Sequence, residues 1–318
     1  MTASYWIGVD LGGTKILTGV FDDHFRLRAR SKLPTEAGQG PAAVFHQVRQ
    51  TVSQVLKEAG LKTGQIAALG MGIPGQIDPA AKRVRYAPNL DWKNLDLVPR
   101  VPASWKWPCY FENDVKLGTY GELTHGAAKG ARSVLGIFVG TGVGGGLILN
   151  GEIYSGFNFS AGEIGHIILH WRKGTDLEAL AGRHCMMQRA AQLLEDAPKN
   201  VRKAWKGVDL SGVKSSQLAS YYEKGDPIAM QLVDDAARAL GAAVGSALNL
   251  LSPEVIVMGG GVAGALGEPF LERIWEVALR YTLPHVADGV RFLPAALEDN
   301  SGIYGAAAFA RARQRAGT

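Results

Sequence analysis

Asp10-Leu11-Gly12-Gly13-Thr14-Lys15 is the stretch that decides how this chain folds, because an apolar run stands on each side of it. Residues 5–9 precede it and residues 16–21 follow it, which predicts two strands joined by a tight glycine turn. Glycine tolerates positive φ and lets a ligand approach the backbone closely. Successive exposed N–H groups in such a turn form an anion site, to which the Thr14 hydroxyl adds a donor.

The same design returns about 130 residues later, in Gly140-Thr141-Gly142-Val143-Gly144-Gly145-Gly146. Two such turns that face each other hold a polyphosphate from two sides, so the pair predicts a nucleotide clamp. A third run, Gly259-Gly260-Gly261, follows a strand expected at 254–258. Ligands of α/β sheets bind beyond the carboxyl ends of strands, where all three runs lie. For the first turn, a plain hairpin without a ligand is the alternative.

Apolar runs of strand and helix length alternate, which predicts the α/β class. Further strands are expected at 25–33, 66–73 and 108–111, and helices at 41–59, 115–123, 176–195, 227–251 and 301–313. Residues 198–216 are polar and predict an irregular surface excursion. The repeated hairpin indicates a duplication in which each half opens in the same way. Two domains are predicted, residues 1–118 with 300–318 and residues 119–299.

Composition excludes several classes of protein. The 318 residues are 47% hydrophobic and 20% charged, which is typical of a soluble globular chain. The net charge of +5 is spread without a Lys/Arg tract, so no nucleic-acid partner is predicted. Only two cysteines, Cys109 and Cys185, are present, which favours a reducing compartment. With no signal peptide and no apolar run of about 18 residues, we expect a cytoplasmic protein without a membrane partner.

Asn113-Asp114 follows a short strand and opens a helix. Phosphoryl transfer needs positioning, charge neutralisation and one carboxylate that accepts the proton of the attacking hydroxyl, which is the role predicted for Asp114. The alternative for Asp114 is a helix N-cap. Asp10 is expected to hold Mg²⁺, directly or through water, with a turn-capping role as its alternative. Lys15 is either a phosphate counter-charge or an exposed strand lysine.

Several further polar residues stand in otherwise apolar surroundings. Acids and amides supply the paired donors and acceptors that a sugar needs. The set predicted to bind one comprises Asn89, Asn113, Glu163, His166 and Glu178. For His166 a purely structural role is the alternative.

Seven segments, in this order, resemble the ROK family of bacterial sugar kinases over nearly the whole chain. They are DLGGTK at 10–15, GIPG at 72–75, APNL at 87–90, ENDV at 112–115, GTGVGGG at 140–146, GEIGH at 162–166 and LSPEVIVMGGG at 251–261. The resemblance implies an actin-like fold of two ribonuclease-H-like domains, with ATP and a sugar bound in the cleft between them. It also implies that Asp114 is the base for a sugar hydroxyl, commonly O6 of a hexose.

The resemblance further assigns binding residues. The sugar would contact Gly75, Asn89, Asn113, Glu163, His166 and Glu178. ATP would be held by Asp10, Gly12, Gly13, Thr14, Lys15, Thr141, Gly142, Gly144, Gly260 and Gly261, with Mg²⁺ at Asp10. Members usually self-associate, so a homodimer is expected. A glucokinase is the leading prediction; the alternatives are an N-acetylhexosamine kinase, a fructokinase, a polyphosphate-dependent glucokinase and a non-catalytic sugar sensor.

Two departures from the family pattern concern zinc and DNA. Most members follow GExGH with a three-cysteine segment that binds structural zinc, whereas residues 171–178 contain no cysteine. Zinc needs about four ligands, so a zinc-free loop is expected, with His166, His170, His184 and Cys185 as a less favoured substitute set. The repressor branch carries a helix-turn-helix before its first glycine turn. Only nine residues precede Asp10 here, so a DNA-binding repressor is not expected.

Overall fold

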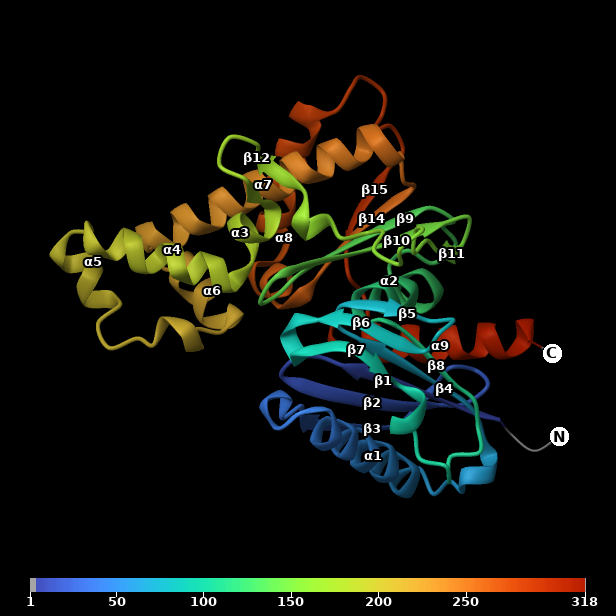
Figure 1. Cartoon of the computed structure of the whole chain (residues 1–318). Coiled ribbons are helices and arrows are strands. Elements are labelled where there is room, and N and C mark those ends of the chain that lie inside the picture. Colours follow the sequence, from blue (N-terminus) through green and yellow to red (C-terminus); the bar gives the residue numbers. More distant parts are fainter. Residues whose placement is uncertain (1–3, 318) are drawn as a thin grey trace. The chain divides into compact units, whose positions relative to one another are not determined.

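A computed structural model describes residues 4–317 of the chain (Figure 1). The chain forms two compact units. Unit 1 comprises residues 4–132, 146–161 and 299–317, and unit 2 comprises residues 133–145 and 162–298. Unit 1 therefore takes in both ends of the described chain.

The first sheet has five strands in the order β3-β2-β1-β4-β8. The strands are β1 (Tyr5–Leu11), β2 (Lys15–Phe21), β3 (Leu27–Pro34), β4 (Ile66–Ile73) and β8 (Cys109–Asn113). β1 to β3 form an antiparallel meander, whereas β4 runs parallel to β1 and β8 runs parallel to β4. The predicted hairpin and the predicted strand at 66–73 are both confirmed.

Helices cover both faces of this sheet, so its central strands are buried on both sides. Ile7 and Val9 pack in the cluster that includes α1 (Pro41–Glu58), while the alternating residue Trp6 packs in the cluster of α9 (Ser301–Ala316). Helix α9 lies very close to the sheet, because a Cβ atom placed on Gly8 would come within 1.9 Å of the Ile303 carbonyl oxygen. The same helix also packs along α2 (Asp114–His125).

A small antiparallel sheet in unit 1 was not expected from the sequence. It consists of β5 (Gln76–Asp78), β6 (Arg83–Ala87) and β7 (Trp92–Asp96). Strands this short alternate through too few residues for their period to be recognised. The one-turn helix at Pro88–Leu90, which carries Asn89, joins β6 to β7.

The second sheet repeats the order of the first. Its order is β11-β10-β9-β14-β15, formed by β9 (Val134–Val139), β10 (Val143–Leu149), β11 (Glu152–Ile153), β14 (Val255–Gly259) and β15 (Arg291–Pro294). The hairpin β9–β10 takes the place of β1–β2, and β14 runs parallel to β9 as β4 does to β1. The prediction that both halves open in the same way is confirmed.

The helices of unit 2 differ from the prediction in four places. They are α3 (Leu177–Ala181), α4 (Arg183–Glu195), α5 (Lys199–Ala204), α6 (Ser215–Glu223), α7 (Pro227–Leu251) and α8 (Gly260–Tyr281). The single helix predicted at 176–195 is wrong, because Gly182 leaves the helical conformation and separates α3 from α4. The excursion predicted at 198–216 contains α5, and α6, which begins at its end, was not predicted. Helix α8 was missed because its glycines and Pro269 hide it, and it is kinked at Gly267 (φ 67°).

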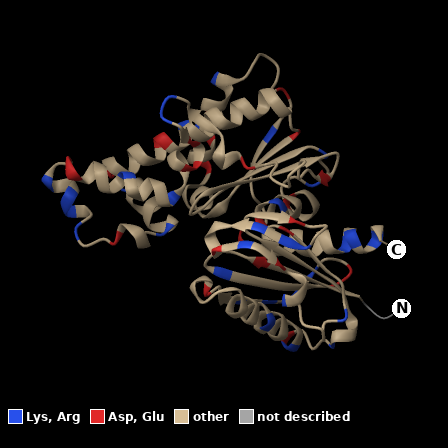
Figure 2. Cartoon of the chain, in the orientation of Figure 1, with Lys and Arg blue, Asp and Glu red and all other residues tan. Residues whose placement is uncertain are grey.

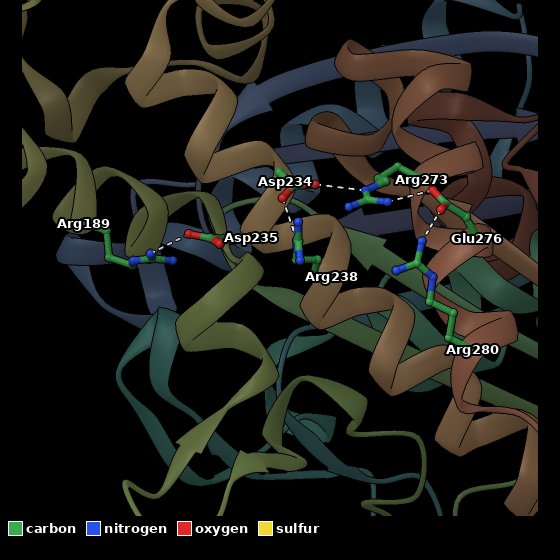
Figure 3. Close-up of polar contacts among 7 residues, drawn as sticks. All are labelled: Arg189, Asp234, Asp235, Arg238, Arg273, Glu276 and Arg280. Carbon is green, nitrogen blue, oxygen red and sulfur yellow. Dashed lines mark hydrogen bonds and ion pairs between the residues drawn. The ribbon is translucent and has the colours of Figure 1, made fainter.

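Ion pairs join the helices of unit 2 (Figure 3). Asp234 of α7 pairs with Arg238 on its own helix at 2.6 Å and with Arg273 of α8 at 2.9 Å. Arg189 of α4 pairs with Asp235 at 2.7 Å. Both signs of charge are scattered along the ribbon (Figure 2). Among residues 4–317, no helix combines the length and apolarity needed to cross a membrane.

Candidate active site

The first glycine turn is held in shape by hydrogen bonds from within and from Thr35. The Gly12 N–H donates to the Lys15 carbonyl at 2.9 Å, and the Thr35 hydroxyl donates to the Gly12 carbonyl at 2.6 Å. Asn89 lies beside the turn, since a Cβ atom on Gly13 would be 3.4 Å from the Asn89 Cβ. The structure therefore brings a predicted sugar residue next to a predicted phosphate turn.

Asp10 stands one residue before the end of β1, in surroundings that disfavour its charged form. Burial raises its pKa from 3.8 to about 6, against the opposing effect of Lys15. The Lys15 ammonium is shared, because it pairs with Asp299 at 2.9 Å. The start of α9 presses on Asp10, where a Cβ atom on Gly302 would lie 2.6 Å from the carboxyl carbon. Asp10 is thus a carboxylate that a bound cation would help to ionise.

This pKa shift predicts a pH-dependent stability. Because the folded pKa exceeds the unfolded one, Asp10 contributes about 3 kcal/mol to folding below pH 4, and this contribution is lost as the pH rises through about 6. Between pH 5 and pH 8 the loss is about 1.4 kcal/mol. In urea unfolding with EDTA present, the free energy of unfolding of the wild type should fall by this amount between pH 5 and pH 8, relative to that of Asp10→Asn. Equal pH profiles for the two proteins would mean that Asp10 is ordinarily hydrated.

Asn113 caps helix α2, and Asp114 is the first residue of that helix. The Asn113 side-chain oxygen accepts from the Lys116 N–H at 3.0 Å, and its amide donates to the Gly75 carbonyl at 3.0 Å. The alternative that Asp114 is the N-cap is therefore wrong. Asp114 accepts from the Val115 N–H at 2.9 Å, and a carboxylate in the first turn is stabilised by the helix dipole.

Strand register places the two predicted reaction residues at one edge of the sheet. Asp10 of β1 pairs with Gly72 of β4, which pairs with Glu112 of β8. Adjacent strands lie about 4.8 Å apart, so Asp10 and Glu112 are separated by roughly 10 Å across the sheet. Asp114 follows two residues beyond Glu112. The carboxyl edge of the sheet thus presents the predicted phosphate turn and the candidate base, with one strand between them.

A buried ion pair beneath this edge was missed by sequence reasoning. Glu112 is 2% exposed, accepts from the Asn113 N–H at 2.9 Å and lies 3.9 Å from the Lys116 ammonium. Lys116 also donates to the Phe159 carbonyl at 2.7 Å. Burial raises the pKa of Glu112, and Lys116 opposes the shift. The only sequence signal was an oppositely charged pair four residues apart where a strand meets a helix.

Unit 2 brings the second and third glycine turns together. Gly260 begins α8 with φ 87°, and a Cβ atom there would lie 2.4 Å from the Val139 carbonyl oxygen. Val139 is the residue before Gly140. Glu178, predicted to contact the sugar, lies against the same turn: its carboxylate accepts from the Val143 N–H at 2.7 Å. A Cβ atom on Gly142 would be 2.1 Å from that carboxylate, so a larger residue there would displace the Glu178 side chain.

Arg183 is a second functional candidate that the sequence did not reveal. Its guanidinium donates to the Thr141 hydroxyl at 3.1 Å, and its N–H donates to the Gly140 carbonyl at 3.1 Å. The first bond places a permanent positive charge at the tip of a turn predicted to hold phosphate. No spacing rule links residue 183 to residue 141, so only the fold exposes the pairing.

The GEIGH segment forms a short turn followed by a two-stranded hairpin. Glu163 precedes the turn Ile164–His166, and His166 places its Nδ1 atom 3.3 Å from Asp176. The hairpin consists of β12 (Ile168–His170) and β13 (Thr175–Asp176). Within residues 4–317, no three His, Cys, Asp or Glu side chains are grouped as a metal site would require, so the substitute zinc set is not assembled.

Comparison with known proteins gives the same family as the motifs. The ROK family profile matches residues 6–313. Glucokinase of Halalkalibacterium halodurans is 32% identical, over 96% of this chain and 94% of its own. The crystal structure of a ROK family glucokinase from Streptomyces griseus, in complex with glucose and AMPPNP, has a TM-score of 0.83 at 29% identity, covering 97% of this chain and 100% of its own.

A further structural match is ROK hexokinase from Thermus thermophilus, with a TM-score of 0.79 at 29% identity. It covers 98% of this chain and 99% of its own. The profile spans nearly the whole sequence, and both structures share its fold. The chain belongs to the ROK family and has the actin-like ATPase fold of that family's sugar kinases.

Proposed function

We propose that this protein is a sugar kinase that transfers the terminal phosphoryl group of ATP to a hexose hydroxyl, with O6 of glucose as the first candidate. The main observation behind this proposal is the strand register, in which Asp10, Gly72 and Glu112 lie side by side on β1, β4 and β8. Because of this register, the DLGGTK turn and Asp114 lie at the same edge of the sheet. Glucokinases of about this degree of identity, and a relative crystallised with glucose and AMPPNP, support it.

Asp114 acts as the general base. It accepts the proton of the sugar hydroxyl as that oxygen attacks the phosphorus, and the bond to the leaving ADP oxygen breaks. A base must be ionised before the reaction, and the N-terminus of α2 favours that state. The Val115 N–H bond to this carboxylate fixes its position at the start of the helix.

We propose that amides and acids of the chain bind the sugar hydroxyls. The Asn113 amide donates one N–H to the Gly75 carbonyl and has a second N–H for the sugar. Asn89 beside the turn, Glu163 and His166 complete the proposed set. For Glu178 we propose an indirect role, since its carboxylate already accepts from the backbone of the second turn.

The glycine turns bind the phosphates of ATP through backbone N–H groups, and Lys15 and Arg183 neutralise charge. Mg²⁺ suits this arrangement with Asp10 as its single protein carboxylate, because Mg²⁺ is usually held by one or two carboxylates, water and phosphate oxygens. When bound, the ion neutralises the charge of the transferred group. We further propose a cytoplasmic homodimer.

The test is coupled ADP release with MgATP across glucose, mannose, fructose, allose, N-acetylglucosamine and N-acetylmannosamine. We expect glucose to give the highest kcat/KM, and ADP release to depend on the sugar. Polyphosphate replaces ATP in a parallel assay with glucose 6-phosphate as the readout. Folded protein that binds glucose calorimetrically but turns over no sugar with either donor would identify a non-catalytic sensor and contradict the kinase.

A further inference from the structure

A surface pocket of about 830 Å³ opens in unit 1 at the amino-terminal end of β8, where Cys109 begins the strand. One part of its lining is cationic, formed by Arg49, Lys82 and Arg100. The rest is largely apolar and includes Pro99, Pro102 and Trp107. No Asp or Glu stands among the described residues that line it. The pocket therefore combines positive charge with a surface suited to a small organic group.

The three cations of this pocket are uncompensated. Within residues 4–317, none of the Arg49, Lys82 and Arg100 side chains forms an ion pair. Many other arginines of the chain do, as Arg83 does with Asp96 at 2.6 Å. Like charges grouped without a counter-ion create a positive potential that attracts anions.

Two buried donors in the same lining also lack acceptors. The Arg100 Nε and the Trp107 Nε1 atoms are buried and make no hydrogen bond within the described chain. Trp107 is only 6% exposed. A buried N–H without an acceptor destabilises the fold, and a ligand oxygen that accepts a hydrogen bond from it would remove this cost. The positive charge of the lining and its two N–H groups without acceptors are independent observations, and both indicate an anion with several acceptor oxygens.

We propose that this pocket binds a phosphate monoester of a small, ring-bearing compound, at a site separate from the catalytic one. A monoester phosphate offers up to two negative charges and three strong acceptor oxygens, and guanidinium groups bind such oxygens with paired hydrogen bonds. The Trp107 ring and the prolines would cover the organic part. The pocket begins at Cys109, whereas Asp114 follows the last residue of β8, so the ligand and the substrate lie at opposite ends of that strand.

Phenyl phosphate is the probe, because it joins a phosphate dianion to an apolar ring. Calorimetric titration of the full chain with phenyl phosphate should show one saturable site. Its affinity for phenyl phosphate should be several-fold higher than for inorganic phosphate or phthalate. Arg100→Gln and Lys82→Gln should each weaken phenyl phosphate about tenfold. Arg85→Gln removes the same charge from an exposed position on β6 outside the lining, and should leave the affinity unchanged. If Arg100→Gln fails to fold, Lys82→Gln alone makes the comparison.

Four outcomes would overturn the proposal. Equal weakening by all three variants would show general charge attraction. Displacement of phenyl phosphate by MgADP would place it in the catalytic site. Tighter binding of phthalate would make the ligand a dicarboxylate. Absence of binding at millimolar phenyl phosphate would exclude the site altogether. Because none of these measurements uses turnover, the result does not depend on whether the kinase assay succeeds.

Discussion

Asp114→Asn should lower kcat by about 10³-fold while leaving glucose binding within a few-fold of wild type. The amide can still accept from the Val115 N–H through its oxygen, so the start of α2 is preserved. It cannot accept the proton of the attacking hydroxyl, and the attacking oxygen stays a poor nucleophile. Single-turnover formation of sugar phosphate, measured with excess enzyme, isolates this step from product release.

Asp96→Asn is the matched control for this change. Asp96 is an exposed carboxylate on β7 that pairs with Arg83, so its neutralisation should leave turnover within two-fold. If Asp114→Asn retains a tenth or more of wild-type turnover, another group is the base. If it unfolds at the temperature of the assay, Asp114 is needed for the helix rather than for proton transfer.

Gly70→Ala should destabilise unit 1 by about 3 kcal/mol or more. Gly70 lies on β4 beneath α9, and a Cβ atom there would come within 1.9 Å of the Ala306 carbonyl oxygen. That oxygen belongs to a helix backbone, so no side chain can rotate to relieve the clash. The helix must move off the sheet, which also opens the cluster that contains Trp6 and Phe21. Urea unfolding followed by circular dichroism measures the loss.

Gly64→Ala provides the comparison, since no atom lies within 4 Å of the Cβ that it would add. Its free energy of unfolding should stay within about 0.5 kcal/mol of wild type. If Gly70→Ala lowers the free energy of unfolding no more than Gly64→Ala does, α9 packs less closely on the sheet than described. Gly8→Ala should then also have a small effect on the free energy of unfolding.

Regular, strongly periodic elements were predictable from the sequence, and elements rich in glycine were not. Helix α1 and strand β4 follow their apolar periods almost residue by residue. Helix α8 fails the same criterion, because glycine and proline suppress helix propensity wherever they occur. Here Gly260 is required by its positive φ and its approach to Val139, so tertiary contact overrides propensity. Helix α8 could therefore be identified only from the structure.

The candidate site divides along the same line. Asp10 and Asp114 could be singled out as candidates because Asp10 lies near the end of β1 and Asp114 directly follows β8, and a strand end is where ligands bind. Which of Asn113 and Asp114 caps helix α2 could not be predicted, since both residue types make good N-caps. Arg183 and the Glu112–Lys116 pair depend on contacts that only the folded chain forms.

The position of α9 has a consequence for how this protein is made. Ile303 and Ala307 complete the cluster that contains Trp6 and Phe21, so β1 is synthesised well before the helix α9 that covers it. At ordinary rates of synthesis that delay is on the order of tens of seconds. Most of unit 2 is drawn from residues 162–298 and is available earlier. A chain whose synthesis stops before residue 299 therefore leaves one face of β1 and β4 without the helix that covers it, which makes it a target for chaperones and proteases.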